Sequence, residues 1–236
     1  AVCNTNSSTI PRESDAVIYT HAGPEIAVAS TKALLTQIVA TFLIGLHLGE
    51  VRGTLNSSQV SDIYNEMLEL PAKLEQILET VEPLRELTRK FAEKNTVLFL
   101  GRHVGFPVAL EGALKLKELA YIHAEGFAGG ELKHGPIALI EEGTPVIAIM
   151  PTQGSLLAEK MASNVQEVKA RGARVIAIAD APLEIAEHTI RIPQSHEFLQ
   201  SVLAVIPLQV IAYEMAIARG NDVDQPRNLA KSVTVE

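Results

Sequence analysis

Between residues 96 and 218, short apolar runs alternate with longer segments of helical periodicity, and this alternation limits the possible folds more than any other feature. The runs lie at 96–100, 145–150, 174–179 and, less clearly, 189–192. Each is long enough for one strand buried on both faces. Helices are expected from Pro107 onward, at 156–170 and at 198–218. This order favours a doubly wound parallel sheet of the α/β class, with right-handed crossovers.

The first 94 residues have a different character. Residues 1–4 resemble the end of a strand whose beginning is missing, which suggests a fragment, and 15–20 form another short strand. An almost entirely apolar helix is expected at 32–48. It is shorter than the roughly 20 residues of a membrane span and contains Lys32, Gln37 and His47, so a helix buried in protein is favoured.

A third segment, 61–94, shows amphipathic periodicity interrupted by Pro71 and Pro83, which predicts three short helices. These would bridge two lobes. We therefore place a domain boundary at residue 95. Residues 1–94 would be the remainder of a first lobe plus a helical linker, and 95–236 a second domain with a C-terminal tail.

Composition excludes several classes of protein. The 236 residues are 47% hydrophobic and carry a net charge of −8, without a Lys/Arg-rich tract, so neither nucleic acid nor an anionic membrane is expected as a partner. The single cysteine, Cys3, is expected to be a small buried hydrophobe, and with no secretory signal in view the cytoplasm is the expected location. The histidines are scattered, so no metal or other cofactor is expected.

One face of the helix after Pro107 concentrates charge. On an α-helix, Glu111, Lys115, Glu118 and Ile122 fall within about 60° of one another. Such a stripe has two interpretations. It can be a solvated ladder of i,i+4 pairs, which is common on helices, or a carboxylate and a lysine held in a cleft for proton transfer.

Four sequence blocks resemble the isomerase half of the glutamine–fructose-6-phosphate aminotransferase family, whose members are also called glucosamine-6-phosphate synthases. They are ALEGALKLKE at 109–118, YIHAE at 121–125, GELKHGP at 130–136 and DQPRNLAKSVTVE at 224–236. The similarity extends through the whole chain. It implies a flavodoxin-like sugar-isomerase (SIS) domain at 95–236, preceded by part of a second SIS lobe, and a tail that closes over the sugar site.

The resemblance also implies a chemistry in which fructose 6-phosphate and glutamine-derived ammonia give glucosamine 6-phosphate. Glu118 would move a proton between sugar C1 and C2 with help from Lys115, and Lys231 would form a Schiff base with the ketone. His134 would act in ring opening from the neighbouring subunit, which requires a homodimer. The residues implied to contact the sugar are Val28, Ser30 and the backbone of Ala230.

Two features of the family are missing from the sequence. The Ser-Gln-Ser-Gly-Glu-Thr loop that holds the sugar phosphate does not occur, and neither does the glutaminase with its terminal cysteine, which Cys3 does not replace. We therefore expect this chain alone not to use glutamine and to bind the phosphate weakly.

Other functions remain open on the residues alone. Without the resemblance, Glu118 and Lys115 would be a surface pair, His134 a turn residue, Ser30 a helix cap and Lys231 a mobile cation. An SIS-domain phosphosugar isomerase or deglycase is one alternative, against which the tail around Lys231 argues. A non-catalytic sugar-phosphate-binding regulator is another, but no helix-turn-helix segment is evident.

Overall fold

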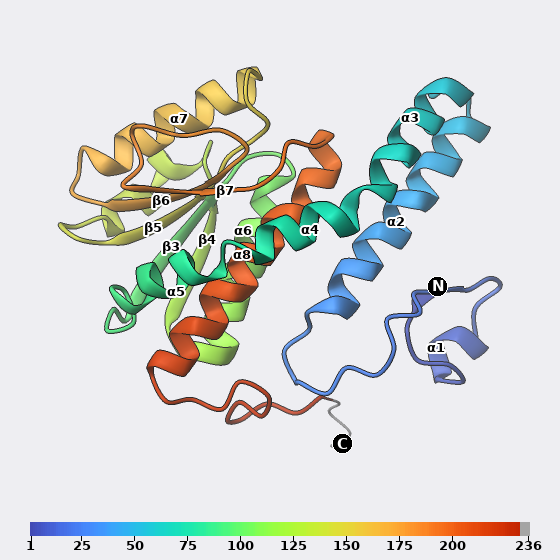
Figure 1. Cartoon of the computed structure of the whole chain (residues 1–236), viewed down its shortest axis with the longest axis horizontal. Coiled ribbons are helices and arrows are strands. Elements are labelled where there is room, and N and C mark those ends of the chain that lie inside the picture. The colour runs from blue at the N-terminus through green and yellow to red at the C-terminus, as the bar shows by residue number, and fades with distance from the viewer. Residues whose placement is uncertain (232–236) are drawn as a thin grey trace.

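The computed structural model describes residues 1–231, except for the side chains of Val81 and Pro83, and its described part contains one large sheet and one small sheet. The large sheet is parallel throughout, with the strand order β4-β3-β5-β6-β7 (Figure 1). Its strands are β3 (Thr96–Gly101), β4 (His123–Ala128), β5 (Pro145–Ile149), β6 (Arg174–Ala179) and β7 (His188–Arg191). The expected doubly wound α/β fold is confirmed, and the four expected strands are all present.

Strand β4 was not predicted. It pairs with β3 from Thr96 opposite His123 to Gly101 opposite Ala128. Its sequence is not a continuous apolar run, because β4 is an edge strand that contains polar residues and a glycine. Most of its positions are only partly buried or exposed. The chain moves from β3 to β4 on one side and then to β5 on the other. The topological switch point of the sheet therefore lies between β3 and β5.

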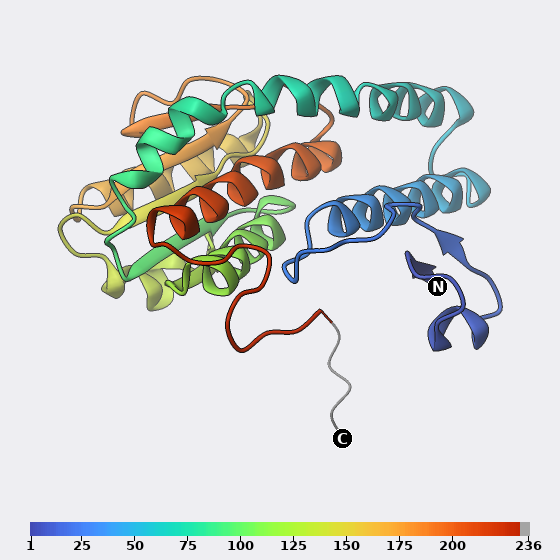
Figure 2. The ribbon, with the colours of Figure 1, turned by 60° about the horizontal axis from the view of Figure 1, so that its bottom comes forward.

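Helices cover both faces of this sheet. One face carries α5 (Val81–Arg89), α6 (Gly105–Lys115) and α8 (Glu197–Ala218), and the other carries α7 (Leu156–Lys169) (Figures 1 and 2). Residues of β3 alternate between the two cores: Val97 and Phe99 enter the first, and Leu98 and Leu100 the second. This period of two explains why the strand is apolar at every position.

The three short helices expected before the sheet are confirmed as α3 (Ser57–Leu68), α4 (Leu70–Leu78) and α5. The first begins four residues earlier than expected because Asn56 and Gln59 form a capping box, with N–H···O distances of 2.9 and 3.0 Å. Helices α4 and α5 pack along α8, and Arg85 Nε donates to the buried Glu214 Oε1 at 3.0 Å. The helical linker thus shares a core with the sheet.

The N-terminal region is loosely packed by comparison. Strands β1 (Val2–Cys3) and β2 (Ile18–Tyr19) form the small parallel sheet, with the short helix α1 (Thr9–Arg12) between them. Cys3 is half-buried, so the expectation of a fully buried thiol is wrong.

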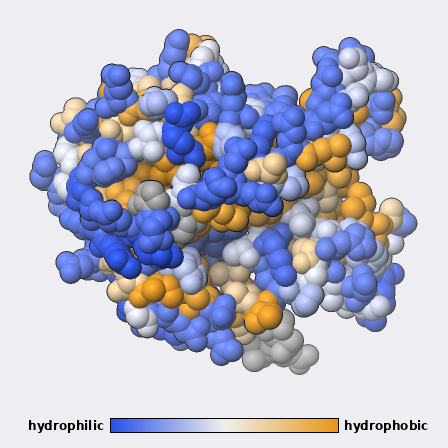
Figure 3. All heavy atoms as spheres, viewed as in Figure 1, coloured by the Kyte–Doolittle hydropathy of each residue, from blue (hydrophilic) through white to orange (hydrophobic). Residues whose placement is uncertain are grey.

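Helix α2 (Lys32–Val51) also corrects an expectation. Its residues are exposed or only partly buried, apart from Ala40 and Leu46, which are buried. The helix packs against α3 and α8 along one side, which leaves Leu48 and Val51 open to solvent, and Figure 3 shows apolar surface in this region. Both α2 and α8 are long and apolar enough to cross a membrane, but 67% of the most apolar window of α8 is buried, against 11% for α2. Burial identifies α8 as the core helix of a soluble fold.

Candidate active site

The first group of candidate residues surrounds the ammonium of Lys115. This side chain is only 2% exposed, and its Nζ lies 3.5 Å from Glu111 Oε1 and in hydrogen-bond contact with Glu118 Oε2. The interpretation as a solvated ladder is therefore wrong. The expected position of Ile122 is also wrong. After Lys115 the helix widens into a π turn, η1 (Leu116–Ala120), and ends at Tyr121, whose φ is 55°, so that Ile122 is buried where the chain enters β4.

The electrostatics of this group follow from two carboxylates sharing one cation. Burial raises the pKa of Glu111, the Lys115 ammonium opposes this, and the nearby Glu118 carboxylate raises it further, so that the net shift is upward. A carboxyl group with a raised pKa next to a buried ammonium is typical of proton-transfer sites.

The π turn that carries Glu118 is held from its far end. Arg219, just after α8, donates from Nη1 to Ala120 O at 3.1 Å and from Nε to Ala92 O at 2.7 Å, and Asn221 Nδ2 donates to Leu119 O at 3.0 Å. These bonds satisfy carbonyl groups that the end of a helix leaves without partners. Because π turns are uncommon and occur often at functional sites, the support given to this one is notable.

The C-terminal tail continues from this anchor. The Tyr121 hydroxyl accepts a hydrogen bond from the Arg227 backbone N–H at 2.7 Å, and the Arg227 guanidinium lies 4.1 Å from the centre of the Tyr121 ring. Three residues before Arg227, Asp224 O accepts a hydrogen bond from Val28 N at 3.0 Å. The tail is thus pinned as far as the described residues extend, as Figure 2 shows where it runs from α8 toward the loop before α2. The last residues of the family block, 232–236, lie outside the described residues.

The second group surrounds Lys231 at the end of the described tail. Its Nζ donates to Ala27 O at 2.9 Å and to Glu25 Oε2 at 3.3 Å, and lies 3.4 Å from Val28 O. The Ser30 hydroxyl donates to the same carboxylate oxygen at 3.4 Å. Lys231, Val28 and Ser30, three of the expected site residues, are therefore gathered in one place. Ser30 is not the cap of α2, since Thr31 holds the N-cap position.

Glu25 is the centre of this second group. Its side chain is 6% exposed, and Oε1 accepts from Thr31 N at 2.6 Å and from Thr31 Oγ1 at 2.9 Å. Burial acts to raise the pKa of Glu25, but the hydrogen bonds from Thr31 and Lys231 outweigh it, and the pKa is lowered. The carboxylate is therefore ionised at neutral pH and holds the Lys231 ammonium.

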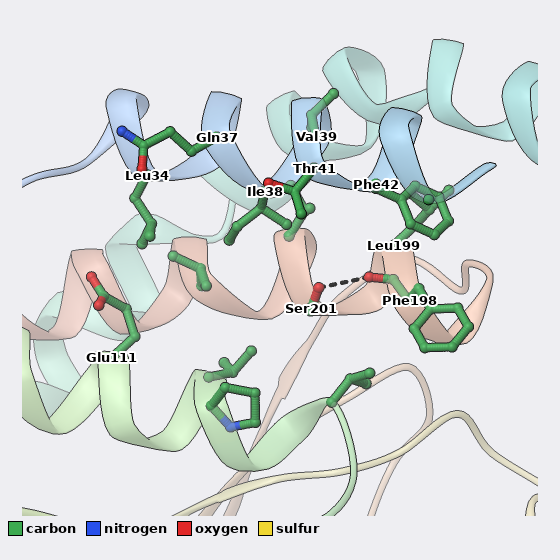
Figure 4. A pocket seen from close by; sticks show the side chains of 16 residues that line it. Leu34, Gln37, Ile38, Val39, Thr41, Phe42, Glu111, Phe198, Leu199 and Ser201 are labelled. Atoms are coloured by element: carbon green, nitrogen blue, oxygen red, sulfur yellow. Dashed lines mark hydrogen bonds between the residues drawn. The ribbon is translucent and has the colours of Figure 1, made fainter. Parts of the chain in front are cut away.

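A cavity of about 600 Å³ lies beside the first group (Figure 4), and of the residues in the two groups only Glu111 lines it. It lies between α2, α6 and α8 and has a mostly apolar lining that includes Ile38, Phe42 and Val202. Glu111, which neighbours Lys115, supplies the charged side chain of the lining. Leu34, four residues after Ser30, lines the same end of the cavity as Glu111 in Figure 4. The size lies within the range of small-molecule sites. Gln37, Thr41 and Ser201 add polar side chains to this lining.

Other expected residues stand apart. Within residues 1–231, no hydrogen bond or ion pair joins Glu118 to Lys231, and none is made by Ala230. His134 lies on the turn η2 (Leu132–His134), where it is 73% exposed and its Nδ1 is 2.7 Å from Glu131 Oε2. The structure thus forms two of the expected associations, Lys115 with Glu118 and Lys231 with Val28 and Ser30.

The sequence analysis missed four residues that shape the site, all for the same reason. Each acts through a contact between distant parts of the chain: Lys231 is 206 positions from Glu25, and Arg227 is 106 positions from Tyr121. No periodicity relates such pairs. The missed residues are Glu25, Tyr121, Arg219 and Arg227. The left-handed backbone at Tyr121 also has no glycine or asparagine to signal it.

Comparisons with known proteins identify the family of the chain. The SIS domain family matches residues 90–219. The isomerising glutamine–fructose-6-phosphate aminotransferases of Streptomyces coelicolor and Mycobacterium tuberculosis are 62% and 58% identical to the whole chain. The chain spans 39% of the length of each. The resemblance recognised in the sequence is thereby confirmed.

Two solved structures have the same fold. The C-terminal domain of glucosamine-fructose-6-phosphate aminotransferase from Francisella tularensis superposes with a TM-score of 0.90 and 38% identity, over 95% of this chain and 64% of that one. Tagatose-6-phosphate ketose/aldose isomerase from Escherichia coli superposes with a TM-score of 0.67 at 21% identity, over 94% of this chain and 60% of that one. The second match shows the fold alone.

Proposed function

The chain belongs to the SIS-domain family, and on that premise we propose that it is the C-terminal, isomerase part of a glutamine–fructose-6-phosphate aminotransferase. The reaction would convert fructose 6-phosphate and ammonia into glucosamine 6-phosphate. One observation carries the proposal: the segment 219–231 is bonded at its start to the π turn of Glu118 and ends with Lys231 on the loop of Val28 and Ser30. One short stretch of chain thus links the carboxylate of Glu118 with the amine of Lys231.

In this proposal Glu118 moves the proton between C1 and C2 of the sugar. It is partly exposed, with 22% of its side chain accessible, while its partner Lys115 is buried. The carboxylate can therefore reach a substrate, and the ammonium fixes its orientation from behind. Glu111 sits on the other side of the same ammonium and lines the cavity, so Lys115 couples the charge of the reacting carboxylate to a second one.

Lys231 would attack the C2 ketone and form the Schiff base, releasing water. Its amine is held by three oxygen atoms, from Glu25, Ala27 and Val28. It must turn away from them and lose a proton before it can act as a nucleophile. The geometry therefore corresponds to a resting arrangement, and sugar binding near Val28, Ser30 and Ala230 would draw the amine out.

The remaining assignments follow the family. His134 would open the sugar ring in the active site of a neighbouring subunit of a homodimer, and its 73% exposure on a surface turn is compatible with donation to a partner. A cytoplasmic location is proposed with it. The sequence contains no Ser-Gln-Ser-Gly-Glu-Thr loop of the type that binds the sugar phosphate in the family.

Isotope exchange tests the proposal. In deuterated water, the purified chain given saturating fructose 6-phosphate should incorporate deuterium at the sugar carbon, and Glu118→Gln should lose this exchange while still binding the sugar. General acid–base groups typically contribute at least about a hundredfold. Glu125→Gln, an exposed carboxylate on β4, is the control. Unchanged exchange in Glu118→Gln would remove Glu118 from the role.

Borohydride trapping tests the second residue. Reduction in the presence of fructose 6-phosphate should attach the sugar to Lys231, and Lys231→Arg should abolish the adduct because a guanidinium does not form a Schiff base under these conditions. Lys169→Arg, an exposed lysine at the end of α7, should leave it intact. Persistent trapping in Lys231→Arg would assign the chemistry to another amine.

A further inference from the structure

A second, smaller pocket lies at the carboxyl edge of the five-stranded sheet and collects positive charge in a chain whose net charge is −8. Its volume is about 200 Å³. Arg102 enters it directly after β3, Lys133 from the turn after β4, and Lys160 from α7, which follows β5. In doubly wound sheets ligands bind at this edge, next to the switch point. Neither Glu118 nor Lys231 lines this pocket.

The guanidinium of Arg102 is oriented before any ligand arrives. Its Nε donates to Asn164 Oδ1 at 2.9 Å, and Asn164 is 5% exposed. A Cβ on Gly129 would lie 2.7 Å from that same oxygen, and one on Gly130 would lie 3.5 and 3.8 Å from Arg102 Nη1 and Nη2. The guanidinium thus rests against a pair of glycines, and the absence of a side chain at Gly129 lets Asn164 and the loop approach.

The charges around the pocket do not balance. Glu167 neutralises Lys133, with Oε1 to Nζ at 2.7 Å, and this hydrogen bond from Lys133 is the main reason that the pKa of Glu167 is lowered. Between residues 1 and 231, no carboxylate lies within 4.0 Å of the guanidinium of Arg102 or the ammonium of Lys160. Two positive charges therefore face the pocket without a compensating anion, together with the exposed hydroxyl of Ser163.

We propose that this pocket binds a phosphate group, either as inorganic phosphate or as the end of a phosphomonoester. The two terminal nitrogens of Arg102, which make no hydrogen bond in the described part of the chain, supply the parallel donors that suit phosphate oxygens, and Lys160 supplies a point charge. The pocket is smaller than typical sites for whole organic ligands, so the phosphate is the part it recognises. The site is additional to the sugar site of the proposed function.

Phosphate titration tests the proposal. Calorimetry of the purified chain with inorganic phosphate, at constant ionic strength set with chloride, should show saturable binding to one site. Lys160→Gln should weaken it several-fold and Arg102→Gln at least about tenfold, as expected for a lost charge-assisted hydrogen bond. Lys169→Gln removes the same charge from the same helix outside the pocket and should have no effect. Lys160 is exposed and has no partner to lose in residues 1–231, so its variant will fold even if Arg102→Gln does not.

The same titration separates this site from the sugar site. Lys231→Gln and Glu118→Gln should bind phosphate as the unaltered chain does. A phosphomonoester such as glycerol phosphate should compete with inorganic phosphate if the terminal phosphate is recognised, and glycerol should not. The proposal is overturned if binding does not saturate, if Lys160→Gln and Lys169→Gln behave alike, or if binding is lost in Lys231→Gln but kept in Arg102→Gln.

Discussion

Lys115 pairs with two glutamates and Lys231 with one, and the two lysines lie in regions that are packed differently. Lys115 is 2% exposed in the sheet lobe, among helices that share a continuous core. Lys231 is 42% exposed on a tail that crosses to the N-terminal loop, and its carboxylate partner, Glu25, is 6% exposed. The residues around Lys115 are therefore positioned by the folding of the sheet and its helices. The residues around Lys231 come together only when the tail docks on the N-terminal loop. Under the proposed function, a fixed part and a docking tail would allow the site to admit and release the sugar.

The long apolar helices repeat this contrast. The most apolar windows of α8 and α2 have mean hydropathies of 1.8 and 1.6, which are nearly equal, yet 67% of the first is buried and 11% of the second. Composition alone thus cannot say which helix forms a core. What distinguishes α8 is that α4, α5, α6 and η1 all pack on it, whereas α2 meets its neighbours along one side.

The sharpest test of the contrast replaces each lysine by methionine. Lys115→Met should cost about 3–5 kcal/mol of unfolding free energy, because it leaves two poorly solvated carboxylates without their cation. Lys231→Met should cost at most about 1 kcal/mol, because the Lys231 side chain is 42% exposed and the Glu25 carboxylate keeps both of its hydrogen bonds from Thr31. Urea unfolding followed by circular dichroism measures both. Adding Glu111→Gln and Glu118→Gln to Lys115→Met should restore much of the loss, and equal losses for the two lysines would break the comparison.

The next test uses the two apolar helices. Leu203→Ala in α8 should cost about 2–5 kcal/mol, since Leu203 is fully buried and its removal leaves a cavity. Leu48→Ala in α2, where the side chain is 50% exposed, should change the unfolding free energy by no more than about 0.5 kcal/mol. The same urea experiment applies. A large loss for Leu48→Ala would mean that the α2 face is covered in solution.

A smaller effect is expected where the tail meets the π turn. Tyr121→Phe removes the hydroxyl that accepts the Arg227 N–H and should cost about 1 kcal/mol of docking, or about fivefold in the opening equilibrium. Hydrogen exchange of the amides of residues 222–231 should accelerate by that factor. Tyr64→Phe, on the exposed surface of α3, provides the control. Unchanged exchange in Tyr121→Phe would show that the tail is held by its other contacts.

The smallest effect is a pH dependence. The folded-state pKa of Glu25 is lowered from its ordinary 4.5, so its contribution is complete above that value and is lost as pH falls through the lowered pKa. Tail docking, followed by NMR of residues 224–231, should weaken below about pH 4.5, and Glu25→Gln should remove this dependence. The contribution of Glu111 to stability depends on pH in the opposite direction. Its pKa is raised, so its contribution is present below 4.5 and is lost as pH rises through the raised value.

The five-stranded sheet was largely predictable because its central strands are buried on both faces. Buried strands such as β5 and β6 are continuous apolar runs, and the core decides their conformation as the pattern suggests. The edge strand β4 and the π turn were not predicted, because a half-polar strand and a widened helical turn have no periodic sequence pattern. The boundary at residue 95 stays a prediction, although the helices before it pack on α8.

The candidate site was predictable only where family blocks carried it. Glu118 with Lys115, and Lys231 with Val28 and Ser30, were named in advance, and their local associations are present. The catalytic roles of Glu118, Lys115, Lys231 and His134 and the sugar contacts of Val28, Ser30 and Ala230 stay predictions. The bonds that join the two halves, through Arg219, Tyr121 and Arg227, arise from tertiary contacts, which a linear pattern does not encode.

The central claim is that Glu118 and Lys231 face one small pocket, and cross-linking measures this directly. In a Cys3→Ser background, the pair Glu118→Cys and Lys231→Cys should react rapidly and within one chain with a bismaleimide whose span matches a hexose. The pair Lys117→Cys and Lys231→Cys, with Lys117 exposed on the same π turn, should react far more slowly. Equal rates for the two pairs, or cross-links only between chains, would contradict the claim.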